Sequence, residues 1–263
     1  MNIRGGRALV RKQLFSYLSA RGFFWTLTVG WMMGPLVYLF VWITAAGPGR
    51  IGNFARNDFI VYYLTLIVVN QLTYPVSNWT IGDGIRYGTF SAWLLRPVAP
   101  IYEAIATDLA TKIVCMPFVA ALVLGLGFLM RPTLTLSAST LIFFLPALVL
   151  AQILRFMVAY VLALLTFWTN RTDALLQLND ALLFLLAGQV APTSLLPASI
   201  RQLAQVLPYR YMLGFPIEIL TGHLSHAEII TGFGWQIGWV VAILAAHQLV
   251  WQRGVRHYAA IGG

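Results

Sequence analysis

The sequence predicts an all-α membrane protein that crosses the bilayer about six times. The chain is 59% hydrophobic and only 10% charged, whereas ordinary soluble domains carry about 45–50% apolar and about 25% charged residues. Long apolar runs recur along its 263 residues, and a run of roughly 20 residues can cross the bilayer as a helix. The alternating strands typical of membrane β-barrels are missing from the pattern.

Residues 1–22 are expected to form a helix at the membrane surface. Val10, Leu14 and Tyr17 recur at helical spacing, and the basic residues between them can reach lipid headgroups. The apolar run that follows is too long for the core of a cleavable signal peptide and lacks a small-residue cleavage site. We therefore interpret it as a first membrane span that stays in the protein.

Six apolar segments are expected to cross the bilayer as helices, because backbone polar groups in lipid must pair within the segment. Their approximate ranges are 23–45, 59–82, 111–130, 140–168, 174–191 and 232–250. With both termini in the cytoplasm, eleven of the 17 Lys and Arg residues fall on the inner side. The net charge of +9 then fits an anionic inner leaflet. Nucleic-acid binding would need a basic polar domain, and residues 1–263 are predicted to form a single transmembrane domain without one.

The stretch "GDGIRYGTFSAWLLRPVAPIYEAI", residues 82–105, makes up most of a region, 83–110, that follows the second predicted span and is expected to be cytoplasmic. A short helix over about 84–95 is expected to end before Pro97. Two sets of its side chains are expected on separate faces: the apolar Tyr87, Phe90 and Leu94, and the basic Arg86 and Arg96. The helix would serve either as an interfacial anchor or as the contact for a cytoplasmic partner.

Further along, Pro100 suits the first turn of another helix. On that helix Asp108 and Lys112 lie four residues apart and can form an ion pair.

Arg155 is predicted to lie deep within a span, where a charged side chain is costly and needs a partner. Asp180 and Glu218 are the candidate partners, and the pair would be either a structural link or a substrate contact. Gln177 and Asp180 near the start of the fifth span are further candidates for lining a polar pathway.

Residues 192–231 are too apolar for a free loop and too interrupted by proline to cross the membrane as one helix. They are expected to form short helices in the outer leaflet. The prolines are Pro192, Pro197, Pro208 and Pro216.

No cofactor is expected on this chain. The only lysines, Lys12 and Lys112, lie outside any G-x-x-x-x-G-K-S/T loop, which a phosphate-binding ATPase requires. Any ATP hydrolysis must therefore reside in a separate polypeptide. His223, His226 and Glu228 have a spacing that a metal could use, but a solvated loop is favoured over a metal site.

Two stretches together resemble the permeases of ABC-2 type transporters, and the similarity covers nearly the whole chain. The first is "IGDGIRYGTFSAWLLRPVAPIYEAIATDL", where the Glu-Arg-Glu-like run usual in the family is reduced to Asp83 and Arg86. The second runs from "FWTNRTD" to "EILTG". Its matching positions are Phe167, Trp168, Gly188, Pro192, Leu196, Pro197, Leu207, Pro208, Tyr211, Pro216 and Gly222.

This resemblance implies an exporter in the inner membrane of a bacterium. Two permeases would form the pathway by alternating access, the second being a different chain or a copy of this one. Two cytoplasmic ATPase subunits would use ATP and Mg, and the helix after the second span would be the coupling helix that contacts them. The residues this assigns to the ATPase contact are Arg86, Tyr87, Phe90, Leu94 and Arg96; Arg155, Gln177 and Asp180 are pathway candidates.

Two other classes of protein are weighed against this interpretation. A membrane enzyme acting on lipid-linked substrates would need acids, histidines or arginines converging at one interface, but the eight acids and four histidines are scattered. A secondary transporter would show inverted repeats or matching broken spans in two halves, and the sequence shows neither.

Overall fold

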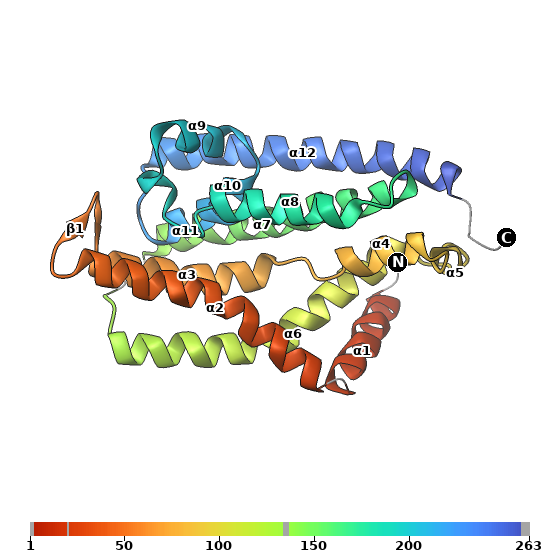
Figure 1. Cartoon of the computed structure of the whole chain (residues 1–263), viewed down its shortest axis with the longest axis horizontal. Helices are drawn as coiled ribbons and strands as arrows, with labels where there is room; N and C mark the ends of the chain where they lie inside the picture. The colour runs from red at the N-terminus through yellow and green to blue at the C-terminus, as the bar shows by residue number, and fades with distance from the viewer. Residues whose placement is uncertain (1–2, 20, 134–136, 259–263) are drawn as a thin grey trace.

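The chain is all-α, apart from one hairpin of two-residue strands (Figure 1). The computed structural model describes residues 3–19, 21–133 and 137–258, and side chains are described for most of them. In chain order the elements are α1 (Ile3–Ser19), α2 (Arg21–Ala46), β1 (Arg50–Ile51), β2 (Phe54–Ala55), α3 (Arg56–Thr73), α4 (Asn78–Arg86), α5 (Phe90–Leu94), α6 (Pro100–Met130), α7 (Ala138–Leu164), η1 (Leu165–Phe167), α8 (Thr172–Leu186), η2 (Thr193–Leu195), α9 (Ala198–Val206), α10 (Tyr209–Met212), α11 (Gly214–Leu220) and α12 (His226–His257).

Four segments in the described part of the chain are long and apolar enough to cross a membrane. They are Arg56–Arg86, Pro100–Met130, Ala138–Phe167 and His226–His257. The first and fifth predicted spans correspond to α2, whose described apolar part is Met32–Ala46, and to α8, which has 15 residues. Met32–Ala46 and α8 are each shorter than the roughly 20 residues of a typical span, although α2 as a whole has 26 residues.

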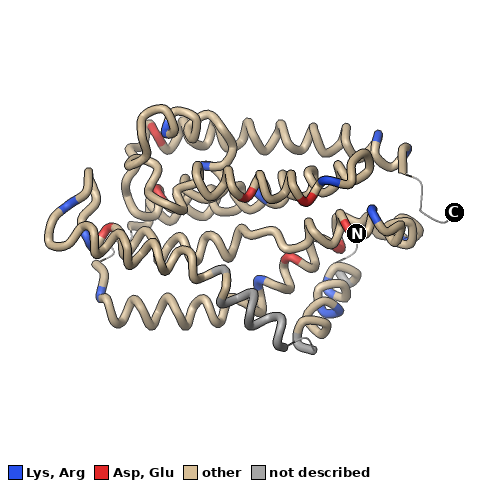
Figure 2. Tube along the Cα trace, in the orientation of Figure 1, with Lys and Arg blue, Asp and Glu red and all other residues tan. Residues whose placement is uncertain are grey.

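The long helices lie roughly along one axis, so the molecule has two distinct ends (Figure 1). α1, α5 and the C-terminal end of α12 lie at one end, and the β1–β2 hairpin and α9 lie toward the other. α1 packs on α6. Long stretches of α6, α7 and α12 between the two ends carry few or no charged residues (Figure 2).

The second predicted span is broken, so the expectation of one helix over 59–82 was wrong. α3 ends at Thr73 and α4 begins at Asn78. Pro75 explains the break, because proline has no N–H to donate and favours an extended conformation in the residue before it. Tyr74 adopts that conformation, with φ −66° and ψ 125°.

The expected helix over 84–95 is also wrong, because two helices share this stretch. α4 ends at Arg86 and α5 starts at Phe90. Between them Gly88 has φ +77°, a conformation that glycine adopts without steric cost. The turn rotates α5 relative to α4, so the face predicted from a continuous helix does not form. Pro100 does begin α6, as predicted.

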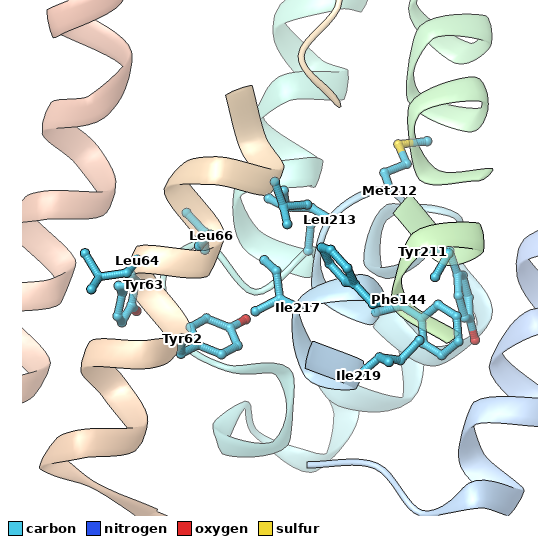
Figure 3. Packing of buried hydrophobic residues seen from close by; sticks show 14 of the residues in the cluster. Tyr62, Tyr63, Leu64, Leu66, Phe144, Tyr211, Met212, Leu213, Ile217 and Ile219 are labelled. Atoms are coloured by element: carbon cyan, nitrogen blue, oxygen red, sulfur yellow. The ribbon is translucent and has the colours of Figure 1, made fainter. Parts of the chain in front are cut away.

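The largest group of buried side chains joins α3 and α7 to the segment before α12 (Figure 3). Tyr62 and Leu66 of α3 lie near Phe144 of α7 and Ile217 of α11 in this core. The predicted segment 192–231 does form short helices, η2, α9, α10 and α11. Part of it is thus integral to the core, as its high apolar content requires.

Candidate functional site

α5 is held against the bundle by a cluster of aromatic rings. The Phe90 side chain is fully buried. Its ring centroid lies 5.8 Å from that of Phe167, 5.9 Å from that of Tyr258 and 6.3 Å from that of Trp251. Tilted and edge-to-face pairs at these separations are favourable. The predicted contact between Phe90 and a partner is therefore corrected: this ring anchors α5 to the ends of α7 and α12.

The large apolar side chains that α5 and its flanks expose are Tyr87, which is 68% exposed, and Leu95, which is 88% exposed. Leu94, predicted at the partner contact, is half-buried and packs against the same aromatic cluster. Leu95 was not among the predicted contact residues, because the apolar spacing of one continuous helix over 84–95 selects Leu94 instead. Single exposed apolar residues are common on protein surfaces, so the exposure of Leu95 shows only that it is accessible to a partner.

Arg86 joins α4 to the start of α8. Its Nη2 lies 2.6 Å from Oδ2 of Asp173, and its Nη1 lies 3.3 Å from Oδ1 of Asp83. The arginine side chain is largely buried, whereas the two carboxylates are partly exposed. Arg86 thus fixes the geometry of this end and offers little free surface to a partner.

Arg96 belongs to a second ion-pair group, which reaches α1. Its Nη1 lies 2.6 Å from Oε2 of Glu103, and the other carboxylate oxygen of Glu103 lies 3.3 Å from Nζ of Lys12. Arg96 itself remains substantially exposed. Glu103 therefore links the N-terminal helix α1 to the chain that leaves α5.

Arg155 of α7 is buried, as its position in a predicted span required, but neither predicted ion pair forms. Its Nη1 donates to Asn70 Oδ1 at 2.8 Å and to Thr73 Oγ1 at 2.9 Å. Its guanidinium lies over the ring of Tyr74, 5.1 Å from the centroid. All of these partners lie where α3 ends, so Arg155 satisfies polar groups next to the helix break.

Asp108 of α6 is a second polar centre beside the same break. Its carboxylate accepts hydrogen bonds from the backbone N–H of Val76 at 2.9 Å, from Nζ of Lys112 at 2.5 Å and from Nε2 of Gln152 at 2.9 Å. The predicted Asp108–Lys112 pair is thus confirmed. The three bonds connect the break, α6 and α7. The sequence signal for this centre is Pro75, which lies within the apolar run of the second predicted span.

The two pathway candidates on α8 differ from Arg155 in that they are not fully buried. Gln177 is exposed, and Asp180 is half-buried with its carboxylate 3.4 Å from the amide of Asn179. Apolar side chains of α8 such as Leu178 and Leu185 are also exposed. This side of α8 therefore presents polar and apolar groups together.

Glu218, the other partner considered for Arg155, is buried in the segment before α12 and pairs with Arg210, whose Nη2 lies 2.6 Å away. It also accepts a hydrogen bond from Thr193. Tyr211 is almost completely buried, and its hydroxyl donates to the carbonyl of Gln205.

The four prolines of this segment differ in exposure. Pro192 and Pro216 are buried, Pro208 is half-buried and Pro197 is exposed. Pro192, Pro197 and Pro208 each occupy the N-cap position of a short helix.

His223 stacks on Phe54, with ring centroids 4.2 Å apart. Burial lowers its pKa below the ordinary value, and the nearby carboxylates of Asp58 and Glu218 only partly oppose the shift. Glu228 is engaged in capping α12 through Ser225. Among the described residues no three His, Cys, Asp or Glu side chains are grouped so that they could hold a metal ion.

A comparison with protein families places the chain. The model of the family described as ABC-2 family transporter protein matches residues 29–262. This range includes the helix break, α5 and the proline-rich segment. No curated protein matches the chain.

Proposed function

The chain belongs to the ABC-2 family of transporter proteins, and from this premise we propose that it is the permease subunit of an ATP-driven exporter. Two cytoplasmic ATPase subunits would bind ATP and Mg and hydrolyse the nucleotide. This chain and a second permease, a different chain or another copy, would form the pathway and alternate between inward and outward access.

The observation that carries the proposal is the exposed tip at one end of the bundle. Tyr87 and Leu95 are exposed there, while buried Phe90 holds α5 firmly against the bundle. A rigidly held apolar tip is suited to fit a groove in a soluble partner and to transmit that partner's movement. Arg96 at its edge adds a positive charge.

The pathway is proposed to run along the exposed side of α8. Exposing the amide of Gln177 and the carboxylate of Asp180 to lipid hydrocarbon would cost free energy. We therefore expect these groups to contact water or a second permease. Arg155 is buried behind this surface, and its positive charge attracts the carboxylate of Asp180 without a direct hydrogen bond. The segment containing Pro192, Pro197, Pro208, Tyr211 and Pro216 would close the pathway on the far side.

The proposed topology has six spans, with α2 and α8 added to the four long segments. α1 would lie on the cytoplasmic surface of the bacterial inner membrane. Both termini and α5 would then be cytoplasmic, as the distribution of Lys and Arg favours. This is consistent with their common position at one end of the bundle (Figure 1).

The test is purification of the tagged chain from its native membranes, followed by measurement of ATPase activity and mass spectrometry of the co-purified subunits. Leu95→Asp should abolish co-purification of the ATPase, because a carboxylate replaces the apolar contact. The matched control is Leu203→Asp, also at an exposed leucine but on α9 toward the other end. An ATPase that remains bound to a folded Leu95→Asp variant, or that never co-purifies with the unaltered chain, would refute the proposal.

A further inference from the structure

A cavity of about 360 Å³ lies between α3, α6, α7 and α12. Its walls are almost entirely apolar, with Leu72, Leu109 and Leu244 among the side chains that form them. Its few polar groups come from Asp108, Lys112 and Gln152, the centre beside the helix break. The volume is within the range of about 300–1,000 Å³ that is usual for small-molecule sites.

The cavity opens toward the surroundings of α6, α7 and α12. Ile105 and Leu109 on α6, Ile153 on α7 and Leu244 on α12 line it and are exposed. All three helices belong to segments long and apolar enough to span a membrane. An apolar opening between such helices admits molecules from the bilayer.

The polar groups of the cavity determine which polar group a bound molecule can carry. Lys112 and Asp108 neutralise each other, so the cavity offers no net charge to offset the desolvation of an ionised ligand. Gln152 donates its N–H to Asp108, but its Oε1 is buried without a hydrogen-bond partner among the described residues. Gln152 Oε1 is therefore an acceptor without a donor, whereas the Lys112 ammonium, which donates to Asp108, has further N–H groups that can donate to a ligand.

We propose that this cavity binds a neutral lipid of the bilayer through a hydroxyl group, with the hydrocarbon chain against Leu109 and Leu244. A hydroxyl can donate to Gln152 Oε1 and accept from Lys112 at the same time. The polar centre lies roughly 12 Å along α6 from its first residue, within a segment long and apolar enough to span a membrane. The cavity is lined by other helices than α8, so its lipid does not depend on the proposed pathway or on an ATPase.

The test uses the purified full-length chain in lipid nanodiscs and a photoreactive hexadecanol carrying a diazirine in its alkyl chain. After irradiation, mass spectrometry should place the label on the cavity-lining parts of α6 and α12. Unlabelled hexadecanol should compete about tenfold better than hexadecanoate or phosphatidylcholine, because of the three only the alcohol has an O–H that can donate to Gln152 Oε1 while its oxygen accepts from Lys112. Equal competition by all three would overturn the proposal.

Leu109→Trp fills the cavity and should lower labelling about fivefold or more, a change of roughly 1 kcal/mol in binding. Leu124→Trp is the matched control, because Leu124 is an exposed leucine of the same helix that does not line the cavity. Gln152→Leu adds no bulk and should remove the preference for the alcohol over the acid. Unchanged labelling in Leu109→Trp, or an unchanged preference in Gln152→Leu, would refute the site. Gel filtration and thermal unfolding of each variant check that it is folded.

Discussion

Replacing Asp108 with leucine should destabilise the protein more than any other single polar substitution near the helix break. The carboxylate accepts three hydrogen bonds, from Val76 N–H, Lys112 Nζ and Gln152 Nε2. Asp108→Leu keeps the approximate volume but leaves the Lys112 ammonium buried without its counter-charge. Breaking a buried ion pair by removing one partner costs about 3–5 kcal/mol, so we expect a loss of at least about 3 kcal/mol.

The double variant separates the stability cost of the unpaired charge from the cost of the changed side chains. In Asp108→Leu/Lys112→Met the ammonium is gone, and only the N–H groups of Val76 and Gln152 remain unpaired, at about 1–3 kcal/mol each if neither relaxes. Lys112→Met alone should cost less than Asp108→Leu, because the carboxylate keeps two hydrogen bonds. The double variant should therefore be more stable than the sum of the single changes predicts, by roughly 2 kcal/mol.

The assay is unfolding in mixed micelles by titration with sodium dodecyl sulfate, followed by tryptophan fluorescence. The four proteins of the cycle are compared under one set of conditions, so errors of extrapolation largely cancel. Two outcomes would refute the reasoning. One is a cost of Asp108→Leu below about 1 kcal/mol, which is less than the cost of an uncompensated charge, and the other is a double variant whose loss equals the sum of the two single losses.

Three further predictions concern other parts of the molecule and can be read from thermal unfolding in detergent. Gly188→Ala should lower stability by about 1–3 kcal/mol, because φ is +83° and a Cβ would lie 2.3 Å from a tyrosine hydroxyl; a neutral result would contradict this geometry. Gly254→Ala should cost about 1–3 kcal/mol by overpacking, since its Cβ would lie 2.2 Å from Cδ2 of Phe167, whereas Gly238→Ala, which has open space, serves as the control. Burial lowers the pKa of His223, so the unfolded chain binds the proton more tightly and stability should fall as pH drops through ~6.5. His223→Gln should reduce that pH dependence, and an unchanged dependence would show that another group titrates.

The all-α class could be predicted from the sequence because it follows from amino-acid composition. An excess of apolar residues in long runs leaves little choice but helices in lipid, and Pro100 and the pair of Asp108 and Lys112 follow from local rules of helix geometry. The partners of Arg155 could not be predicted in the same way. Asp180 and Glu218 were sensible partners by charge, but the structure uses the neutral oxygens of residues near the end of α3.

The prediction of which side chains α5 exposes was wrong for a different reason. The phase of a helix is readable from apolar spacing only while the helix continues, and the turn at Gly88 resets it. A shift of one position exchanges Leu94 for Leu95 at the surface, while Phe90 turns into the aromatic cluster. In so short a helix, tertiary contacts with Trp251 decide the orientation, and they lie far away in the sequence.

In the proposed exporter, a movement of α5 can reach the membrane-spanning helices in two ways, through packed side chains and through the polypeptide chain itself. The buried ring of Phe90 passes it to the ends of α7 and α12. The chain itself passes it through α4, which packs on α7, to the break at 74–77. Because Pro75 interrupts the helical hydrogen bonds, α4 can change its angle to α3 at a cost smaller than that of bending a continuous helix.

α3 itself has less freedom than this break. Tyr62 and Tyr63 donate hydrogen bonds to the carbonyls of Gly188 and Val190, and the surrounding side chains form the main core (Figure 3). A densely packed core responds to force as a unit and does not deform gradually. Movement entering at α5 should therefore be absorbed at 74–77, where Asp108 and Arg155 hold the polar groups of the break. On this argument the buried charges serve to keep an interrupted span intact while its two halves change their relative angle.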